Sequence, residues 1–124
     1  EVSGKTVALL GLSFKPETDD MRDAPSVDII RGLQERGARV RAFDPQAMAE
    51  ASRLLPGVEL CKDAYEACQG ADLLTIVTEW NQFRMLDLEK VKRLLSEPRL
   101  VDMRNIYKRD VMERQGFLYW GVGV

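Results

Sequence analysis

The sequence predicts a three-layer α/β domain in which a mainly parallel sheet of about six strands lies between layers of helices. Short apolar segments alternate with segments of helical spacing along the chain, an order typical of parallel sheets with right-handed crossovers. Two apolar segments, Lys5–Leu10 and Ala71–Thr78, are nearly continuous, as expected for central strands covered on both faces. The 124 residues are enough for one domain and too few for two.

Six strands are expected, each a short apolar run bounded by residues typical of turns. In chain order they are Lys5–Leu10, Ala38–Phe43, Val58–Cys61, Ala71–Thr78, Arg99–Met103 and Phe117–Val122. The last of them is alternatively a terminal extended segment. Gly11 ends the first strand, Asp44-Pro45 ends the second, and Pro98 separates the fifth strand from the helix before it.

Five helices are expected between these strands. The first begins at Pro25, because proline suits the first helical position, with Asp23 as its candidate N-cap, and it ends at Gly37. Asp63 is the expected cap of the third helix. The second to fifth helices are expected at Ala47–Leu55, Asp63 to about Gly70, Asp87–Leu95 and Asp110–Gln115. A loop is expected at Glu79–Met85.

The composition indicates a globular cytoplasmic protein and excludes several classes of function. The formal net charge is −2, so no nucleic-acid or membrane partner is expected, and no apolar run is long enough to span a bilayer. Cys61 and Cys68 are not spaced for zinc and histidine is absent, so we expect no metal site and no catalytic residue. Since the chain begins with Glu1 and its apolar pattern begins almost at once, we expect a fragment of a longer protein.

A ligand is expected beyond the carboxyl ends of the strands, where the strand order of an open parallel sheet reverses. The loops to consider are Gly11–Ala24, Glu79–Met85 and Arg104–Arg109. The first of them contains a single glycine, Gly11, where a dinucleotide-binding domain would have G-x-G-x-x-G. Asp44 ends the second strand but lies 33 positions after Gly11, rather than about 20, so a strand-ending turn is favoured over a ribose contact.

Two cations in the first loop, Lys15 and Arg22, are either solvated surface charges or groups that bind an anion. Their position at the expected crevice favours an anion, because lysine places a point charge on a phosphate and arginine offers two donors. Phe14 beside Lys15 would supply an apolar wall for a ring or sugar, or would fold back onto the core. Asp19 and Asp20 are interpreted as braces of the loop rather than as metal ligands, since no third carboxylate lies at ligand spacing.

Three further residues belong to the other two loops. Arg104 follows the fifth strand and is the second candidate for anion binding. Trp80 and Phe83 follow the fourth strand and either line the crevice or pack the loop, of which packing is favoured.

Four motifs together carry a resemblance to a known family. The segments "GLSFKPETDDMRDAPS", "FDP", "VTEWNQF" and "VDMRNIY" resemble the C-terminal domain of the UDP-glucose/GDP-mannose dehydrogenase family, and the resemblance covers essentially the whole chain. It implies a Rossmann-like domain over residues 1–124 that binds the UDP part of a nucleotide sugar. It also implies that Phe14, Lys15 and Arg104 contact the substrate and that Arg22 contacts NAD.

The resemblance further implies that an N-terminal NAD-binding domain and a central dimerisation domain are absent from this chain, and that the whole protein is a homodimer or larger. The family oxidises a nucleotide sugar with two NAD⁺ through a covalent cysteine, whose motif neither Cys61 nor Cys68 matches. The motifs look most like the branch that converts UDP-glucose to UDP-glucuronate for polysaccharide biosynthesis; GDP-mannose and UDP-N-acetylmannosamine dehydrogenases are alternatives. Two alternatives lie outside this family: a signalling receiver domain and a self-contained NAD-binding domain.

Overall fold

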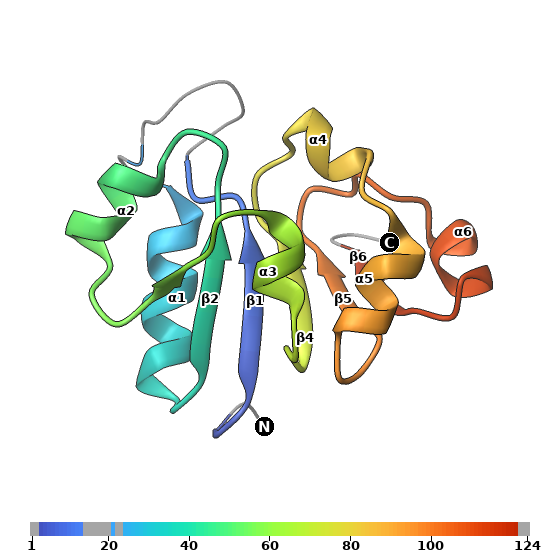
Figure 1. Ribbon diagram of the computed structural model, residues 1–124, viewed down its shortest axis with the longest axis horizontal. Helices are drawn as coiled ribbons and strands as arrows, with labels where there is room; N and C mark the ends of the chain where they lie inside the picture. Colours follow the sequence, from blue (N-terminus) through green and yellow to red (C-terminus); the bar gives the residue numbers. More distant parts are fainter. Residues whose placement is uncertain (1–2, 14–20, 22–23, 122–124) are drawn as a thin grey trace.

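The computed structural model describes residues 3–13, 21 and 24–121, and in this part of the chain the strands form a single parallel sheet. The sheet has six strands in the order β3-β2-β1-β4-β5-β6 (Figure 1). The strands are β1 (Thr6–Leu10), β2 (Arg39–Phe43), β3 (Glu59–Leu60), β4 (Leu73–Ile76), β5 (Arg99–Asp102) and β6 (Leu118–Gly121). Every neighbouring pair is parallel, so the predicted fold class is confirmed.

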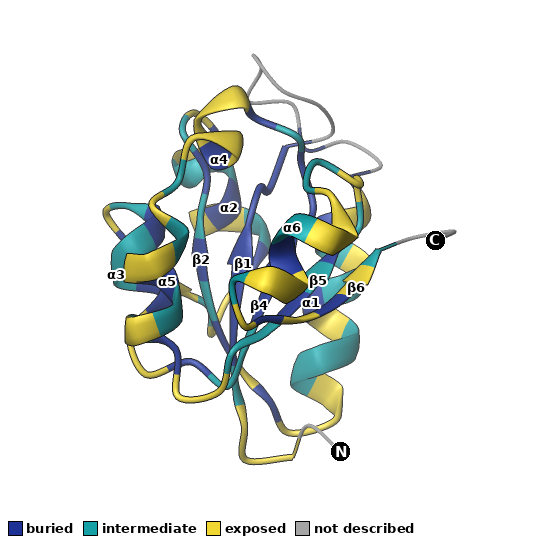
Figure 2. Cartoon of the chain, turned by 90° about the vertical axis from the view of Figure 1, so that its right-hand side faces the viewer, coloured by how far each residue is buried: buried dark blue, intermediate teal, exposed yellow. Residues whose placement is uncertain are grey.

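Helices cover both faces of the sheet. They are α1 (Pro25–Glu35), α2 (Met48–Leu54), α3 (Ala64–Cys68), α4 (Asn81–Arg84), α5 (Leu88–Leu94) and α6 (Arg109–Arg114). In Figure 2, α3 and α5 lie on one side of the strands and α1 on the other. Leu9 of β1 packs with Ile30 of α1, whereas Ala8 and Leu10 belong to a second cluster with Val91 of α5. β1 is therefore covered on both faces, as its continuous apolar run predicts.

The strand order distinguishes a dinucleotide-binding fold from the fold of a signalling receiver. The order reverses between β1 and β4, which are direct neighbours, and the sequence 3-2-1-4-5-6 is that of dinucleotide-binding folds. A signalling receiver has the order 2-1-3-4-5 instead, so the structure excludes that alternative.

The structure corrects some boundaries. The expected loop Glu79–Met85 contains one helical turn, α4, which is too short to show a periodic pattern in the sequence. The residue at the N-cap of α1 is Ala24, whose side chain makes no capping bond, and Asp23 lies outside the described residues. Asp63 is confirmed as the cap of α3, where its carboxylate accepts a hydrogen bond from the backbone N–H of Glu66 at 2.8 Å.

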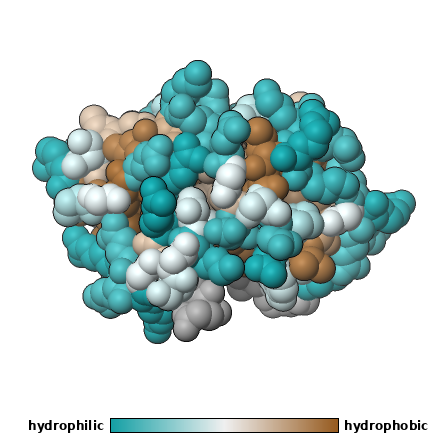
Figure 3. All heavy atoms as spheres, turned by 60° about the horizontal axis from the view of Figure 1, so that its bottom comes forward, coloured by the Kyte–Doolittle hydropathy of each residue, from teal (hydrophilic) through white to brown (hydrophobic). Residues whose placement is uncertain are grey.

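The surface at the edge where the strands begin mixes polar and apolar side chains. Figure 3 turns this edge toward the viewer, and the surface there is mainly hydrophilic, with hydrophobic side chains in separate patches. None of the helices in the described part of the chain is long and apolar enough to cross a bilayer.

Candidate ligand-binding site

The site expected from the sequence lies where β1 and β4 end, at the reversal of strand order. In Figure 1 the end of β1, the turn α4 and the connection from β5 to α6 all lie at this carboxyl edge. The topology therefore brings the three predicted loops to one end of the sheet.

Asp44, directly after β2, is a buried carboxylate that joins three segments of this edge. Its Oδ2 accepts hydrogen bonds from the backbone N–H of Leu12 at 2.7 Å, from that of Ser13 at 3.1 Å and from the indole N–H of Trp80 at 3.2 Å. Its Oδ1 accepts from the N–H groups of Gln46 and Ala47, both at 2.8 Å. The last two bonds confirm the predicted strand-ending turn.

The other bonds of Asp44 were not foreseen in the sequence. Asp44 has no exposed surface, and its two oxygens are occupied by protein N–H groups. Its carboxylate is therefore a brace between loops and is not available to a ribose.

Gly11 is required by a close approach between the ends of β1 and β4. Its φ is +99°, and a Cβ at this position would lie 2.4 Å from the backbone nitrogen of Thr78. The hydroxyl of Thr78 donates to the backbone oxygen of Ser13 at 2.8 Å, and that of Ser26 donates to the backbone oxygen of Leu12 at 2.6 Å. Gly11 thus allows β1 and β4 to pack closely where the strand order reverses. The hydroxyls of Thr78 and Ser26 hold the start of the first loop.

Five of the residues singled out in the sequence lie outside the described residues: Phe14, Lys15, Asp19, Asp20 and Arg22. Their roles stay predictions. Ser13, Met21 and Ala24, which flank them, are described and buried, so both ends of the loop are anchored on the domain.

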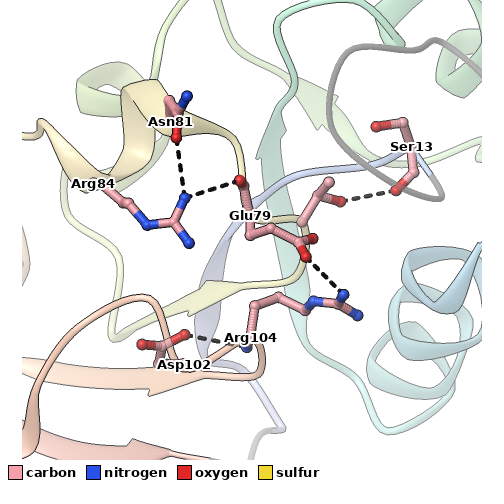
Figure 4. A network of polar contacts seen from close by, with 7 residues as sticks. Ser13, Glu79, Asn81, Arg84, Asp102 and Arg104 are labelled. Carbon is pink, nitrogen blue, oxygen red and sulfur yellow. Dashed lines mark hydrogen bonds and ion pairs between the residues drawn. The ribbon is translucent and has the colours of Figure 1, made fainter.

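Arg104 lies at the carboxyl edge, as predicted, and is paired with Glu79. Its Nη2 is 2.8 Å from Oε2 of Glu79, and the side chains of Arg104 and Glu79 are 40% and 29% exposed (Figure 4). Arg84 of α4 donates to the backbone oxygen of Glu79 at 3.5 Å and to Oδ1 of Asn81 at 3.1 Å. The side chain of Arg104 and the side chain of Arg84 therefore both contact Glu79.

Glu79 is a further residue of the candidate site, and sequence reasoning missed it. Burial opposes its ionisation, but the hydrogen bond from Arg104 and the charges of Arg104 and Arg84 outweigh burial, so the pKa of Glu79 lies below its ordinary value. The signal available in the sequence was its position, directly after a buried strand and at the same edge as Arg104.

Asp102, the last residue of β5, fixes the backbone from which Arg104 projects. It has no exposed surface and accepts hydrogen bonds from the backbone N–H groups of Arg104 at 3.2 Å and Tyr107 at 2.9 Å. The hydroxyl of Tyr119 donates to it at 2.7 Å. Burial and this hydrogen bond to a carboxylate raise the pKa of Tyr119 above its ordinary value.

The aromatic residues after β4 pack the loop and do not line a crevice. Trp80 is 5% exposed and Phe83 is fully buried, with its ring in edge contact with that of Phe43 at a centroid distance of 6.4 Å. The interpretation as packing residues is confirmed.

The two cysteines are buried thiols, and the described residues offer them no partner suited to catalysis. Burial raises the pKa of Cys68 to about 12 and also raises that of Cys61. Among the described residues, no group of three acidic or cysteine side chains is arranged to hold a metal ion.

The sequence and the structure of this chain both match known dehydrogenases. The sequence model described as "UDP-glucose/GDP-mannose dehydrogenase family, UDP binding domain" matches residues 8–109. The chain is 46% identical over 123 residues to UDP-glucose 6-dehydrogenase of Rhizobium meliloti (strain 1021), covering 99% of this chain and 28% of that protein. It is 43% identical over 123 residues to UDP-glucose 6-dehydrogenase TuaD of Bacillus subtilis (strain 168), covering 98% and 27%.

Among solved structures, a UDP-glucose dehydrogenase from the archaeon Pyrobaculum islandicum matches with a TM-score of 0.79 and 33% identity, over 97% of this chain and 26% of that one. NDP-N-acetyl-D-galactosaminuronic acid dehydrogenase from Methanosarcina mazei Go1 matches with a TM-score of 0.85 and 28% identity, over 98% and 25%. This chain therefore spans little more than a quarter of the length of the relatives it matches.

Proposed function

Because this chain belongs to the UDP-glucose/GDP-mannose dehydrogenase family, as its UDP-binding domain, we propose that it holds the UDP part of a nucleotide sugar at the carboxyl edge of its sheet. The observation that carries the proposal is the position of Arg104, a partly exposed guanidinium at the end of β5, close to the reversal of strand order. A cation at this edge suits the diphosphate of the ligand.

Within this site, Phe14 and Lys15 would contact the nucleotide sugar together with Arg104, and Arg22 would reach the cofactor across a cleft to another domain. The described start of the first loop supports this assignment, since Leu12 is hydrogen-bonded to Asp44 and Ser13 to Thr78 at the same edge as Arg104. Such contacts lie far from the reacting carbon of the sugar. Their contribution is to position that carbon, and Arg22 would couple the domains as the cleft closes.

The described residues do not fit an NAD site of their own. Where a dinucleotide would approach the backbone after β1, the space beside Gly11 is filled by Thr78, and Asp44 is occupied by protein N–H groups. NAD is therefore assigned to a domain outside this chain, where it would accept hydride from the sugar.

In the whole protein, this chain would be the C-terminal domain, joined to an N-terminal NAD-binding domain and a central dimerisation domain in a cytoplasmic homodimer or larger assembly. That protein would oxidise UDP-glucose to UDP-glucuronate with two NAD⁺. The covalent chemistry would reside outside this chain, in agreement with the buried, protonated thiols of Cys61 and Cys68.

The test is calorimetric titration of the longer protein that contains this chain with UDP, UDP-glucose, GDP-mannose and UDP-N-acetylmannosamine. UDP-glucose is expected to bind more tightly than the other two sugars. Arg104→Ala and Lys15→Ala should each weaken UDP-glucose binding about 10- to 100-fold, the value of a hydrogen bond to a charged group.

Arg36→Ala is the matched control, because Arg36 follows α1 at the opposite edge of the sheet and is exposed. Equal affinities for the two variants and the control would refute the site. Preferential binding of GDP-mannose or UDP-N-acetylmannosamine would leave the site in place and change the substrate.

A further inference from the structure

Glu79 pairs with Arg104 through only one of its two carboxylate oxygens. Oε2 accepts the hydrogen bond from Arg104, whereas Oε1 is buried and has no hydrogen-bond partner among the described residues. The two residues follow neighbouring strands, since Ile76 of β4 pairs with Asp102 of β5. In Figure 4 their side chains meet across the gap between the two loops.

We propose that Glu79 is the positioning residue of Arg104 and holds its guanidinium in the orientation that receives the anionic part of the nucleotide sugar. The proposal rests on the proposed function and deepens it, because it assigns a role to an acidic residue beside a site for an anion. Glu79 acts through Arg104 and needs no contact with the ligand.

The geometry of the pair leaves most of the guanidinium available. Arginine carries five N–H donors, and among the described residues the side chain of Arg104 makes a single hydrogen bond, through Nη2 to Glu79. A bidentate pair would occupy the fork that suits a phosphate, whereas this monodentate pair leaves donors for a ligand.

The backbone of Arg104 is already fixed, so the ion pair supplies the remaining restraint. Asp102 accepts the N–H of Arg104, and Asn105 turns the chain with a φ of +54°. The long side chain would otherwise sample many rotamers and would lose that freedom when the ligand binds. Holding it beforehand lowers the entropy lost on binding.

The test measures steady-state oxidation of UDP-glucose by the full-length protein with Glu79→Gln and Glu79→Ala. We expect Glu79→Ala to raise the KM for UDP-glucose about two- to tenfold, the value of one immobilised long side chain, with kcat within twofold. The KM for NAD⁺ should not change. Glu79→Gln should restore part of the loss, because its amide oxygen still accepts from Arg104.

Glu50→Gln is the control for loss of an acid from an ion pair. Glu50 pairs with Arg53 at 2.6 Å on the exposed side of α2, and its replacement should leave the KM unchanged. Thermal unfolding of each variant reports whether the fold is retained, and Glu79→Gln, which keeps the shape of the side chain, provides a second measurement if Glu79→Ala fails to fold.

A double-mutant cycle distinguishes positioning from a general structural role. In the Arg104→Ala background, Glu79→Ala should add no further change in KM, whereas a structural role would add the same increase in both backgrounds. An unchanged KM in Glu79→Gln and Glu79→Ala would overturn the proposal, and so would a lowered KM, which would make Glu79 a competitor of the ligand. If Arg104→Ala itself left the KM unchanged, the proposed function of the site would fail first.

Discussion

Replacement of Asp44 by asparagine tests whether one buried carboxylate joins three segments at the carboxyl edge of the sheet. Asparagine has nearly the same shape but only one oxygen, and its NH₂ group is a donor. In the less costly orientation, its oxygen faces the N–H groups of Leu12, Ser13 and Trp80, which leaves the N–H groups of Gln46 and Ala47 opposite another donor.

The expected loss follows from the burial of these groups. Ala47 is fully buried, so its unsatisfied N–H costs about 1–3 kcal/mol, whereas Gln46 is exposed and water can replace most of its bond. The three N–H groups that keep an acceptor lose the charge assistance of the carboxylate, which adds about 1–2 kcal/mol in total. We expect Asp44→Asn to lower the free energy of unfolding by about 3 kcal/mol, a large part of the 5–15 kcal/mol typical of a domain.

Equilibrium urea unfolding followed by far-UV circular dichroism measures this change. Asp28→Asn is the control, since Asp28 is exposed in the first turn of α1, and it should change the free energy of unfolding by about 0.5 kcal/mol or less. A loss below about 1 kcal/mol in Asp44→Asn would refute the reasoning, because it would mean that these hydrogen bonds contribute little or that water replaces them.

Two further predictions concern the close approach of Gly11 to Thr78 and the two buried thiols. Gly11→Ala should lower the free energy of unfolding by about 2–5 kcal/mol through a strained positive φ and the collision with Thr78. Gly4→Ala, where φ is also positive but no atom lies within 4 Å of the added Cβ, should lower it by only about 1–2 kcal/mol; equal losses in urea titrations would contradict the collision. Because burial raises the pKa of Cys68 to about 12 and that of Cys61 in the same direction, both thiols should stay protonated and resist alkylation at pH 8 until the protein is unfolded, and mass spectrometry showing rapid labelling of the folded protein would be the opposite result.

The fold was predictable because its signals are local. Apolar runs of strand length, Pro25 at a helix start and Asp63 at a cap are read within a few residues of one another, and the structure has the corresponding elements. The position of the ligand edge followed from topology, since the carboxyl ends of parallel strands meet at one end of the sheet. The one-turn helix α4 was missed because four residues cannot show a period.

The proposed identity of the ligand came from a long, specific motif and not from composition or periodicity. The same motif contains Phe14, Lys15 and Arg22, so the sequence determined which side chains to test even though they lie outside the described residues. A second motif, "VDMRNIY", contains Arg104, and the predicted order of strands placed that residue just beyond the end of β5.

Only the tertiary structure decided what Gly11, Asp44 and Glu79 do. Asp44 bonds to groups 31 to 36 positions away in the chain, and Glu79 pairs with an arginine 25 positions away, so nothing in the neighbouring sequence reveals these partners. Parallel strands are joined by crossovers of a dozen or more residues, which separates in sequence the groups that meet where those strands end. Sequence alone thus determined the fold and the edge at which a ligand is expected, whereas folding decided which carboxylate braces the loops and which one is paired with the arginine.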